Sequence, residues 1–585
     1  MLLGPQPATC NLSPFLISVR LLVFLLTLFL SPCLRAQDVD ALLETYLAGY
    51  WKANPARAAT PSGVHAYDGQ LEDSTPAAID VEVQRNRAAL EAFQRLNPAG
   101  LPAGQRVDRE MVMDRIRLAL LDLQQLQRWK RDPGWYVCLL QESVAALVGR
   151  EFAPAERRYT ALATRLKGFP KLLQQARMNL DRPPLPATRK AMGQIAQVAD
   201  WIEKQVPQAA AEQGASKKLR KRVAQEAARA AGSLRQFGAW LESNLLPRSV
   251  DAPLFPSPPG APAGSLYREY FRYYLGATLT AEELQAAAER DALETRERMR
   301  QVAGQINSSQ SVPQALEEIA AARLPQDKLA AAFREAFSDA RRFVEEKGLV
   351  SLPDRDRLRV LTVPAYSPAG PARLEAPGPF EPDLPWFYYV PAPELLGVEQ
   401  AEFLLRDSNP IAISLLAVRD GYPGKYVQSD AMSRSSNLAR KVFASRAFTE
   451  GWALYCEQMV FEEGFRPDPR ARLVQLHHAL VAQLEAVIDV RLHSGGLSPS
   501  DAVSLLVNDG FLDQAAAEER VERALLFPGE AAAPYAGKLE ILRLREELRK
   551  KQGPAFVLKE FHDRLLSLGA PPLRLARDLL LNDVN

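Results

Sequence analysis

Apolar residues recur three and four positions apart along most of this 585-residue chain. Side chains with that spacing lie on one face of a helix, so the pattern predicts amphipathic α-helices. Before residue 247 we expect helices over 79–95, 106–130, 137–148, 154–180, 186–213 and 216–246. After residue 265 we expect them over 266–276, 280–308, 313–322, 326–347, 398–406, 410–419, 425–464, 469–494, 498–508, 514–525, 535–551, 556–567 and 572–581.

Two short segments lack this helical spacing and are rich in β-branched, apolar and aromatic residues. Residues 358–363 and 386–390 are therefore predicted to be strands. The expected fold class is mainly α, with a large helical body and a small β-sheet.

Residues 247–265 (PRSVDAPLFPSPPGAPAGS) interrupt the helical pattern with proline, alanine and serine. This segment is predicted to be either a flexible linker or a long loop on one compact body. It separates an N-terminal helical region, 37–246, from a C-terminal region, 266–585.

The beginning of the chain, residues 1–36, has the pattern of an export signal. The apolar run 21–30 (LLVFLLTLFL) follows Arg20 and precedes the small residue Ala36, after which a cleaved chain would begin. An uncleaved anchor is the second interpretation, and a lipoprotein signal ending at Cys33 is the third. We expect an exported protein, periplasmic or secreted, with membrane contact only through an uncleaved N-terminal segment.

Charge and motifs exclude several function classes. Lys and Arg total 72 against 70 Asp and Glu, a balance that argues against nucleic-acid binding by bulk charge. The chain contains no GxSxG, Walker A, GxGxxG or HExxH motif and only five histidines. Beyond the leader, Cys138 and Cys456 are either one disulfide or two separate thiols.

Two segments carry a resemblance to a known family. Residues 418–428 (VRDGYPGKYVQ) and 448–457 (FTEGWALYCE) resemble the bacterial family called domain of unknown function 885. In that family the first segment usually reads His-Glu-x-x-Pro-Gly-His-x-x-Gln and the second contains Glu-Gly-Trp-Ala. Residues 59–68 (ATPSGVHAYD), 489–493 (DVRLH) and 528–537 (PGEAAAPYAG) resemble other elements of the family in the same order.

The resemblance implies a fold and a chemistry. The family is grouped with zincin-like metallopeptidases whose third zinc ligand is a glutamate. It therefore implies a zincin-like helical body with a cleft between helices and with peptide as a partner. In zincins an edge strand beside the active-site helix holds extended peptide, a role that would fall to 358–363 or 386–390.

The metal motif departs from the family pattern at three positions. Arg419 and Lys425 stand where the resemblance calls for zinc-binding histidines, and Asp420 stands in place of the general-base glutamate. Guanidinium offers no lone pair, and an amine offers one only when its pKa is strongly lowered. Glu450 alone remains of the three ligands, so we expect no bound metal or other cofactor.

A charge argument suggests what replaces the metal. A divalent ion, two neutral histidines and two carboxylates sum to zero, and so do two cations with Asp420 and Glu450. We therefore hypothesise that Arg419 and Lys425 compensate the missing metal and that Glu450 pairs with one of them. The alternative interpretation is an exposed charged turn, with Glu450 and Glu457 as solvent-facing carboxylates.

Three more residues are candidates for a role at the site. His493 lies one helical turn after Asp489 and is interpreted as a substrate-side relic, a proton shuttle or a helix hydrogen bond. Tyr535 and Arg523 are candidates for contacting a substrate carboxylate or an oxyanion, or for stabilising C-terminal packing.

Three functions fit these residues. The first is an exported metallopeptidase-like protein that has lost its metal and keeps a peptide-binding cleft. The second is a hydrolase that uses Asp420 and Glu450 without an ordinary zinc site. The third is a helical scaffold or interaction protein.

Overall fold

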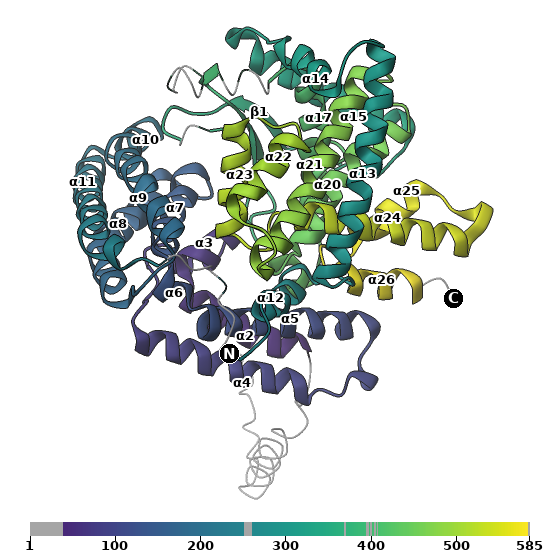
Figure 1. Cartoon of the computed structure of the whole chain (residues 1–585). Helices are drawn as coiled ribbons and strands as arrows, with labels where there is room; N and C mark the ends of the chain where they lie inside the picture. Colours follow the sequence, from purple (N-terminus) through teal and green to yellow (C-terminus); the bar gives the residue numbers. More distant parts are fainter. Residues whose placement is uncertain are drawn as a thin grey trace, which may run out of the picture.

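The computed structural model describes residues 39–250, 255, 260–367, 370–393, 397, 401–402, 405 and 408–582. The predicted signal segment and most of the predicted helix 398–406 lie outside these residues. The described chain is mainly α-helical and contains a small three-stranded sheet, which confirms the predicted fold class (Figure 1). In the described residues, no helix is both long and apolar enough to cross a bilayer.

The N-terminal helices fall into two groups (Figure 1). A lower group contains α2 (Val39–Ala53), α4 (Pro76–Arg95) and α5 (Ala103–Leu121). A second group, on the left of the figure, contains α7 (Pro133–Gly149), α8 (Ala155–Asn179), α9 (Leu185–Asp200), α10 (Val206–Glu212) and α11 (Lys217–Trp240). The second group encloses its own apolar core, in which Leu162, Leu166 and Phe169 are completely buried.

The C-terminal helices surround one long central helix, α21 (Pro469–Ser494). In chain order, the other helices of this region are α12 (Ser265–Leu275), α13 (Ala281–Ile306), α14 (Val312–Ala321), α15 (Leu329–Lys347), α17 (Pro410–Leu416), α18 (Lys425–Ser433), α19 (Leu438–Val442), α20 (Arg446–Glu462), α22 (Pro499–Asn508), α23 (Gln514–Leu526), α24 (Ala533–Gln552), α25 (Leu558–Ser567) and α26 (Leu573–Asn582). Helix α21 is buried on almost every side, and its polar residues Gln475, Gln483, Asp489 and His493 are buried with the apolar ones.

The sheet has the order β1-β3-β2. Strand β1 (Leu358–Thr362) pairs in parallel with β3 (Trp386–Val390), which pairs antiparallel with β2 (Arg373–Glu375). Both predicted strands are present, whereas the three-residue β2 lacks an apolar pattern that could have predicted it. Because β3 is paired on both sides, 386–390 cannot be the peptide-binding edge strand, and that prediction is wrong.

The predicted helix 425–464 is three helices, α18, α19 and α20. Asn437 caps the start of α19 by accepting a hydrogen bond from the Arg440 amide, and Ser445 caps α20 through the Phe448 amide. The breaks matter for the site. In one continuous helix, 25 residues of separation would place Lys425 and Glu450 about 37 Å apart, at 1.5 Å of rise per residue.

Helices α20 and α24 approach closely where a glycine of each meets the other. A Cβ atom built on Gly537 would lie 1.7 Å from the carbonyl oxygen of Ala447, and one on Gly451 would lie 2.4 Å from the Gly537 Cα. Only hydrogen fits in this contact. It fixes α20, which carries Glu450 and Glu457, against α24.

The predicted break at 247–265 is packed against the body where it is described. The Val250 amide bonds to the Pro183 carbonyl, and the Phe255 ring is buried against Tyr267 and Tyr270. Cys138 and Cys456 are two free thiols, so the disulfide interpretation is wrong.

Candidate functional site

A turn between α17 and α18 gathers Arg419, Asp420 and Lys425. A single π-helical turn, Ala417–Gly421, carries Arg419 and Asp420, and the chain then bends at Pro423 before α18 begins with Lys425. The Gly424 amide donates to the Val418 carbonyl, and the Trp452 indole donates to the Pro423 carbonyl at 2.9 Å. These bonds hold the turn against α20.

Lys425 lies between two carboxylates. Its Nζ is 2.9 Å from Glu450 Oε2 and 3.7 Å from Asp420 Oδ1. The pairing of Glu450 with a cation that the sequence suggested is therefore present. Arg446 approaches the other oxygen of Glu450 at 3.7 Å, from one turn earlier in α20.

Arg419 pairs with a different carboxylate. Its Nη1 lies 3.2 Å from Glu457 Oε1, and His478 Nδ1 of α21 lies 3.1 Å from Glu457 Oε2. The Glu457 side chain is only 1% exposed. The alternative of an exposed turn with solvent-facing carboxylates is therefore wrong for Glu457 and for Asp420, which is also buried.

The two carboxylates beside Lys425, Asp420 and Glu450, differ in their pKa. Burial raises the pKa of Asp420, and the nearby Lys425 and Arg419 only partly offset it. Burial would also raise the pKa of Glu450, but Lys425 and Arg446 outweigh it and hold that pKa below its ordinary value. The deeper Glu457 likewise has a lowered pKa, because His478 and Arg419 outweigh its burial.

The central strand of the sheet reaches this site through one side chain. The Tyr388 hydroxyl of β3 donates to Asp420 Oδ2 at 3.4 Å. Burial and the adjacent carboxylate raise the pKa of Tyr388 well above its ordinary value, so the phenol stays protonated and acts as a donor.

A line of alternating charges extends from Glu450 toward the surface. Arg446 lies 3.6 Å from Glu530, and Arg523 lies 3.2 Å from the second oxygen of Glu530. Arg523 is thus connected to Glu450 through two intervening side chains, and its own side chain is 66% exposed.

His493 and Tyr535 make their hydrogen bonds elsewhere. His493 is buried and bonds through Nε2 to the Ala524 carbonyl, and burial lowers its pKa to about 4. Tyr535 donates to Asp291 on α13 at 2.8 Å. The neutral, buried His493 ring has the character of a structural histidine.

Asp489 holds the loop before α24 in place through hydrogen bonds. It accepts hydrogen bonds from the amides of Gly529 and Ala532 and from the Tyr267 hydroxyl, each at 3.0 Å. Burial raises its pKa to about 7. These bonds fix the loop that carries Glu530 beside Arg446.

Four side chains at the site were missed or misinterpreted from the sequence: Tyr388, Arg446, Glu457 and His478. One signal was available, because Glu450 and Glu457 are two helical turns apart and share a face of α20. The other contacts join distant segments, and no local pattern predicts them.

Zinc does not fit this donor set. At the two positions where the resemblance implies zinc-binding histidines, this chain has a guanidinium and an ammonium, and the ammonium lies against Glu450, the third ligand that the resemblance implies. Across the part of the chain that the structure describes, no three His, Cys, Asp or Glu side chains gather where they could hold a metal ion.

Comparison with known proteins gives one family and two similar structures. The model of a family of bacterial proteins of unknown function, domain of unknown function 885, matches residues 57–580. A protein from Shewanella oneidensis is 23% identical with a TM-score of 0.76, covering 93% of this chain and 100% of that one. A protein from Colwellia psychrerythraea is 17% identical with a TM-score of 0.75, covering 94% and 99%.

Both structures are described as putative lipoproteins, the first of unknown function. At these identities the likeness shows the fold alone. Among curated proteins there is no match.

Proposed function

Because this chain belongs to the bacterial family called domain of unknown function 885, we propose that it is an exported, peptidase-like protein that binds peptide without a metal. One observation carries the proposal. Lys425 Nζ lies within reach of both Glu450 and Asp420, so an ammonium group stands between the carboxylates of the metal position.

The charge balance explains why such a site is stable. A partly buried carboxylate without a partner is strongly destabilising, and here each carboxylate has at least one cation within 4 Å. Lys425 pairs with Glu450 and Asp420, while Arg419 pairs with Glu457. Both cations are side chains of the protein, so this charge balance exists without a bound ligand.

Peptide would bind by strand addition to β1. In the order β1-β3-β2, β1 is an edge strand, and its Leu361 side chain is 44% exposed. An extended peptide can add to such an edge through main-chain hydrogen bonds. The site residues would then contact the peptide without cleaving it.

Export is supported by two observations. Residues 21–30 and Ala36 have the pattern of a secretory signal, and both similar structures are described as putative lipoproteins. Mass spectrometry of the N-terminus from the natural host tests this: a chain that begins at Gln37 indicates cleavage, and a lipid on Cys33 indicates an anchor. An intact N-terminus on cytoplasmic protein would contradict export.

The decisive experiment restores the family residues. The triple variant Arg419→His, Asp420→Glu, Lys425→His should bind one zinc ion, measured by elemental analysis after dialysis and by calorimetry. The wild-type protein should bind none. The matched control adds Glu450→Gln to the triple variant and should lose the zinc.

Two results would contradict the proposal. Stoichiometric zinc in the wild-type protein would show that the cations do not replace a metal. A folded triple variant that binds no zinc would show that the position lacks metal-site geometry and would favour a scaffold. Peptide binding is tested separately with fluorescein-labelled casein, whose anisotropy should rise with the wild-type protein and rise less with Leu361→Asp.

A metal-free hydrolase is the second candidate, and the opposed pKa shifts favour it. Asp420 has a raised pKa and Glu450 a lowered one, the division expected of a general acid and a general base. Casein hydrolysis that persists with chelators and disappears in both Asp420→Asn and Glu450→Gln would support this candidate. Absence of hydrolysis by the wild-type protein would exclude it for this substrate.

A further inference from the structure

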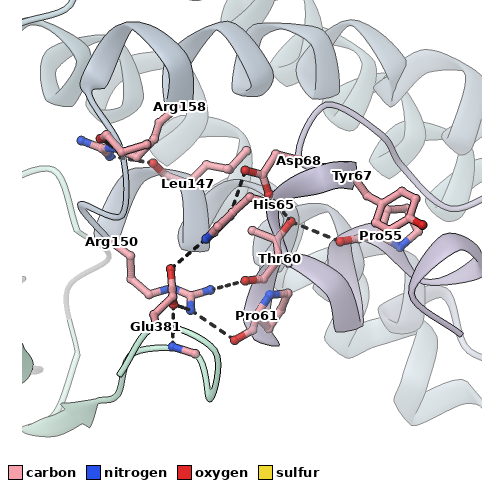
Figure 2. Close-up of polar contacts among 12 residues, drawn as sticks. Pro55, Thr60, Pro61, His65, Tyr67, Asp68, Leu147, Arg150, Arg158 and Glu381 are labelled. Carbon is pink, nitrogen blue, oxygen red and sulfur yellow. Dashed lines mark hydrogen bonds and ion pairs between the residues drawn. The ribbon is translucent and has the colours of Figure 1, made fainter. Parts of the chain in front are cut away.

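A second charged cluster lies away from the site, where the N-terminal helices meet the sheet (Figure 2). His65 stands at its centre, in a short turn after α3 (Thr60–Ser62). Its Nδ1 is 3.0 Å from Asp68 Oδ2, and its Nε2 is 3.1 Å from Glu381 Oε1. Glu381 belongs to the loop between β2 and β3, more than 300 residues away in the sequence.

The two contacts define the protonation state of the ring. A neutral imidazole donates from only one nitrogen, whereas a protonated imidazolium donates from both. With a carboxylate at each nitrogen, both contacts are hydrogen bonds only when the ring is an imidazolium, so this arrangement favours the protonated form. Phe152 covers one face, with ring centroids 3.6 Å apart and planes 10° apart.

The same loop is tied to the N-terminal region by further bonds. Arg150, at the end of α7, lies 2.6 Å from Glu381 Oε2 and donates to the carbonyls of Pro61 and Thr60 (Figure 2). The Phe380 amide donates to the Ser62 carbonyl at 3.0 Å. We call the set His65, Asp68, Arg150 and Glu381 the clasp.

The backbones also touch at the clasp. A Cβ atom on Gly378 would lie 2.6 Å from both the Gly63 nitrogen and the Ser62 carbonyl carbon. The Gly378 amide donates to Glu381 Oε2, so the carboxylate that holds His65 also shapes its own loop. A weaker His65–Glu381 bond would therefore also loosen the backbone contact between Gly378 and Gly63.

We propose that the clasp is a pH-responsive joint, closed when His65 is protonated and loosened when it is neutral, that holds the N-terminal helices to the loop leading into β3. Strand β3 begins shortly after Glu381 and carries Tyr388, which contacts Asp420. The joint therefore acts on the strand that reaches the candidate site. It requires no assumption about what that site binds.

The surrounding charges support protonation of the ring. Asp68 and Glu381 contact it directly, and Arg150 neutralises Glu381 from the end of α7. From α8, Arg165 donates to the Thr60 hydroxyl, which in turn donates to Asp68, and the buried Glu72 faces Arg165. Glu72 also lies beside Arg57, and its burial raises its pKa, so the anions that act on the ring itself are Asp68 and Glu381.

The sign of the pH effect follows from the imidazole. Burial would lower the pKa of His65, but hydrogen bonds to Asp68 and Glu381 outweigh it and raise the pKa above its ordinary value. A raised pKa in the folded state means that the bond contributes fully below the unfolded value of about 6.5 and is lost as pH rises through the folded value. The clasp therefore loosens toward alkaline pH.

The first test follows the ring directly. The full-length protein with labelled histidine contains only five imidazoles, and burial lowers the pKa of His477, His493 and His562 to about 4. An NMR titration should show the His65 midpoint above 6.5. Glu381→Gln should lower that midpoint, whereas Glu375→Gln, a nearby carboxylate outside the clasp, should leave it unchanged.

The second test follows the backbone. Hydrogen exchange of the Phe380 amide is compared with that of the Val363 amide, which bonds to Val390 beside the sheet. The ratio of the two rates should rise severalfold between about pH 6 and pH 9, beyond the common effect of hydroxide that the ratio cancels. In His65→Gln the ratio should be high and constant.

Two outcomes overturn the proposal. One is a His65 midpoint at or below 6.5. The other is a Phe380 to Val363 ratio that depends on pH in His65→Gln as it does in the wild-type protein. If His65→Gln does not fold, the same exchange ratio in Glu381→Gln, which keeps a side chain of equal size, must lose its pH dependence or the proposal fails.

Discussion

The candidate site and the clasp share an arrangement and differ in one property. Each places a basic side chain between two carboxylates: Lys425 between Glu450 and Asp420, and His65 between Asp68 and Glu381. An ammonium remains charged across the neutral range, whereas an imidazole changes charge within it. The first cluster thus keeps its cation across the neutral range, whereas the second has a cation whose charge pH can remove.

The clusters also differ in what lies behind them. Behind Lys425 is a second pair, Arg419 with Glu457, and Glu457 is held again by His478. Behind His65 are a glycine contact and a loop that leads to β3. The comparison indicates that the site is built to stay fixed, while the clasp is built at a joint between two regions.

The largest expected effect is at the deepest carboxylate. Glu457→Leu leaves Arg419 without its anion and should lower the free energy of unfolding by about 3–5 kcal/mol. The measurement is chemical denaturation at neutral pH. As a control, Glu91→Ala removes one member of an exposed ion pair and should change stability by less than about 0.5 kcal/mol. Equal effects would refute the description of the site as a fixed core.

A double-mutant cycle measures the interaction between Lys425 and Glu450. Lys425→Met and Glu450→Gln, singly and together, should give a coupling of about 1–2 kcal/mol, because both groups are mostly but not fully buried. The same cycle on Lys204 and Asp200, an exposed pair, is the control. A coupling no larger than that control would show that Lys425 does not compensate Glu450.

The pH dependence separates the two clusters most sharply. His65→Gln should lower the free energy of unfolding by about 1 kcal/mol at about pH 5.5, because a charged hydrogen bond is lost. The loss should become smaller as pH rises through the raised pKa of His65. Lys425→Met should have nearly the same cost between about pH 6 and pH 9. If the free energy of unfolding of the two variants depends on pH in the same way, the two clusters do not differ in their response to pH.

The smallest expected effect is at the phenol of β3. Tyr388→Phe removes one 3.4 Å hydrogen bond to Asp420 and should cost about 0.5 kcal/mol. It should also raise the pKa of Asp420 further, because a donor to the carboxylate is lost. Carbon-detected NMR of the Asp420 carboxyl would measure this shift, with Tyr389→Phe as the neighbouring control.

Local patterns predicted most of the helices and both longer strands, because apolar spacing is a property of neighbouring residues. The division of 425–464 was missed even though its signals were present: Asn437 and Ser445 are favourable helix caps, and no glycine or proline drew attention to them. A pair between Glu450 and either Lys425 or Arg419 was predicted only through the resemblance to a family, and the structure has the pair with Lys425. Glu457 with His478 depends on how α20 meets α21, which sequence spacing does not specify.

The double pairing of Glu457 also limits the evolutionary routes open to this protein. Replacing Arg419 with histidine in one step would remove a cation from a buried carboxylate before Lys425 had changed and before any metal could bind. The intermediate would be less stable than either end state. A metal site at this position would therefore require several coordinated substitutions.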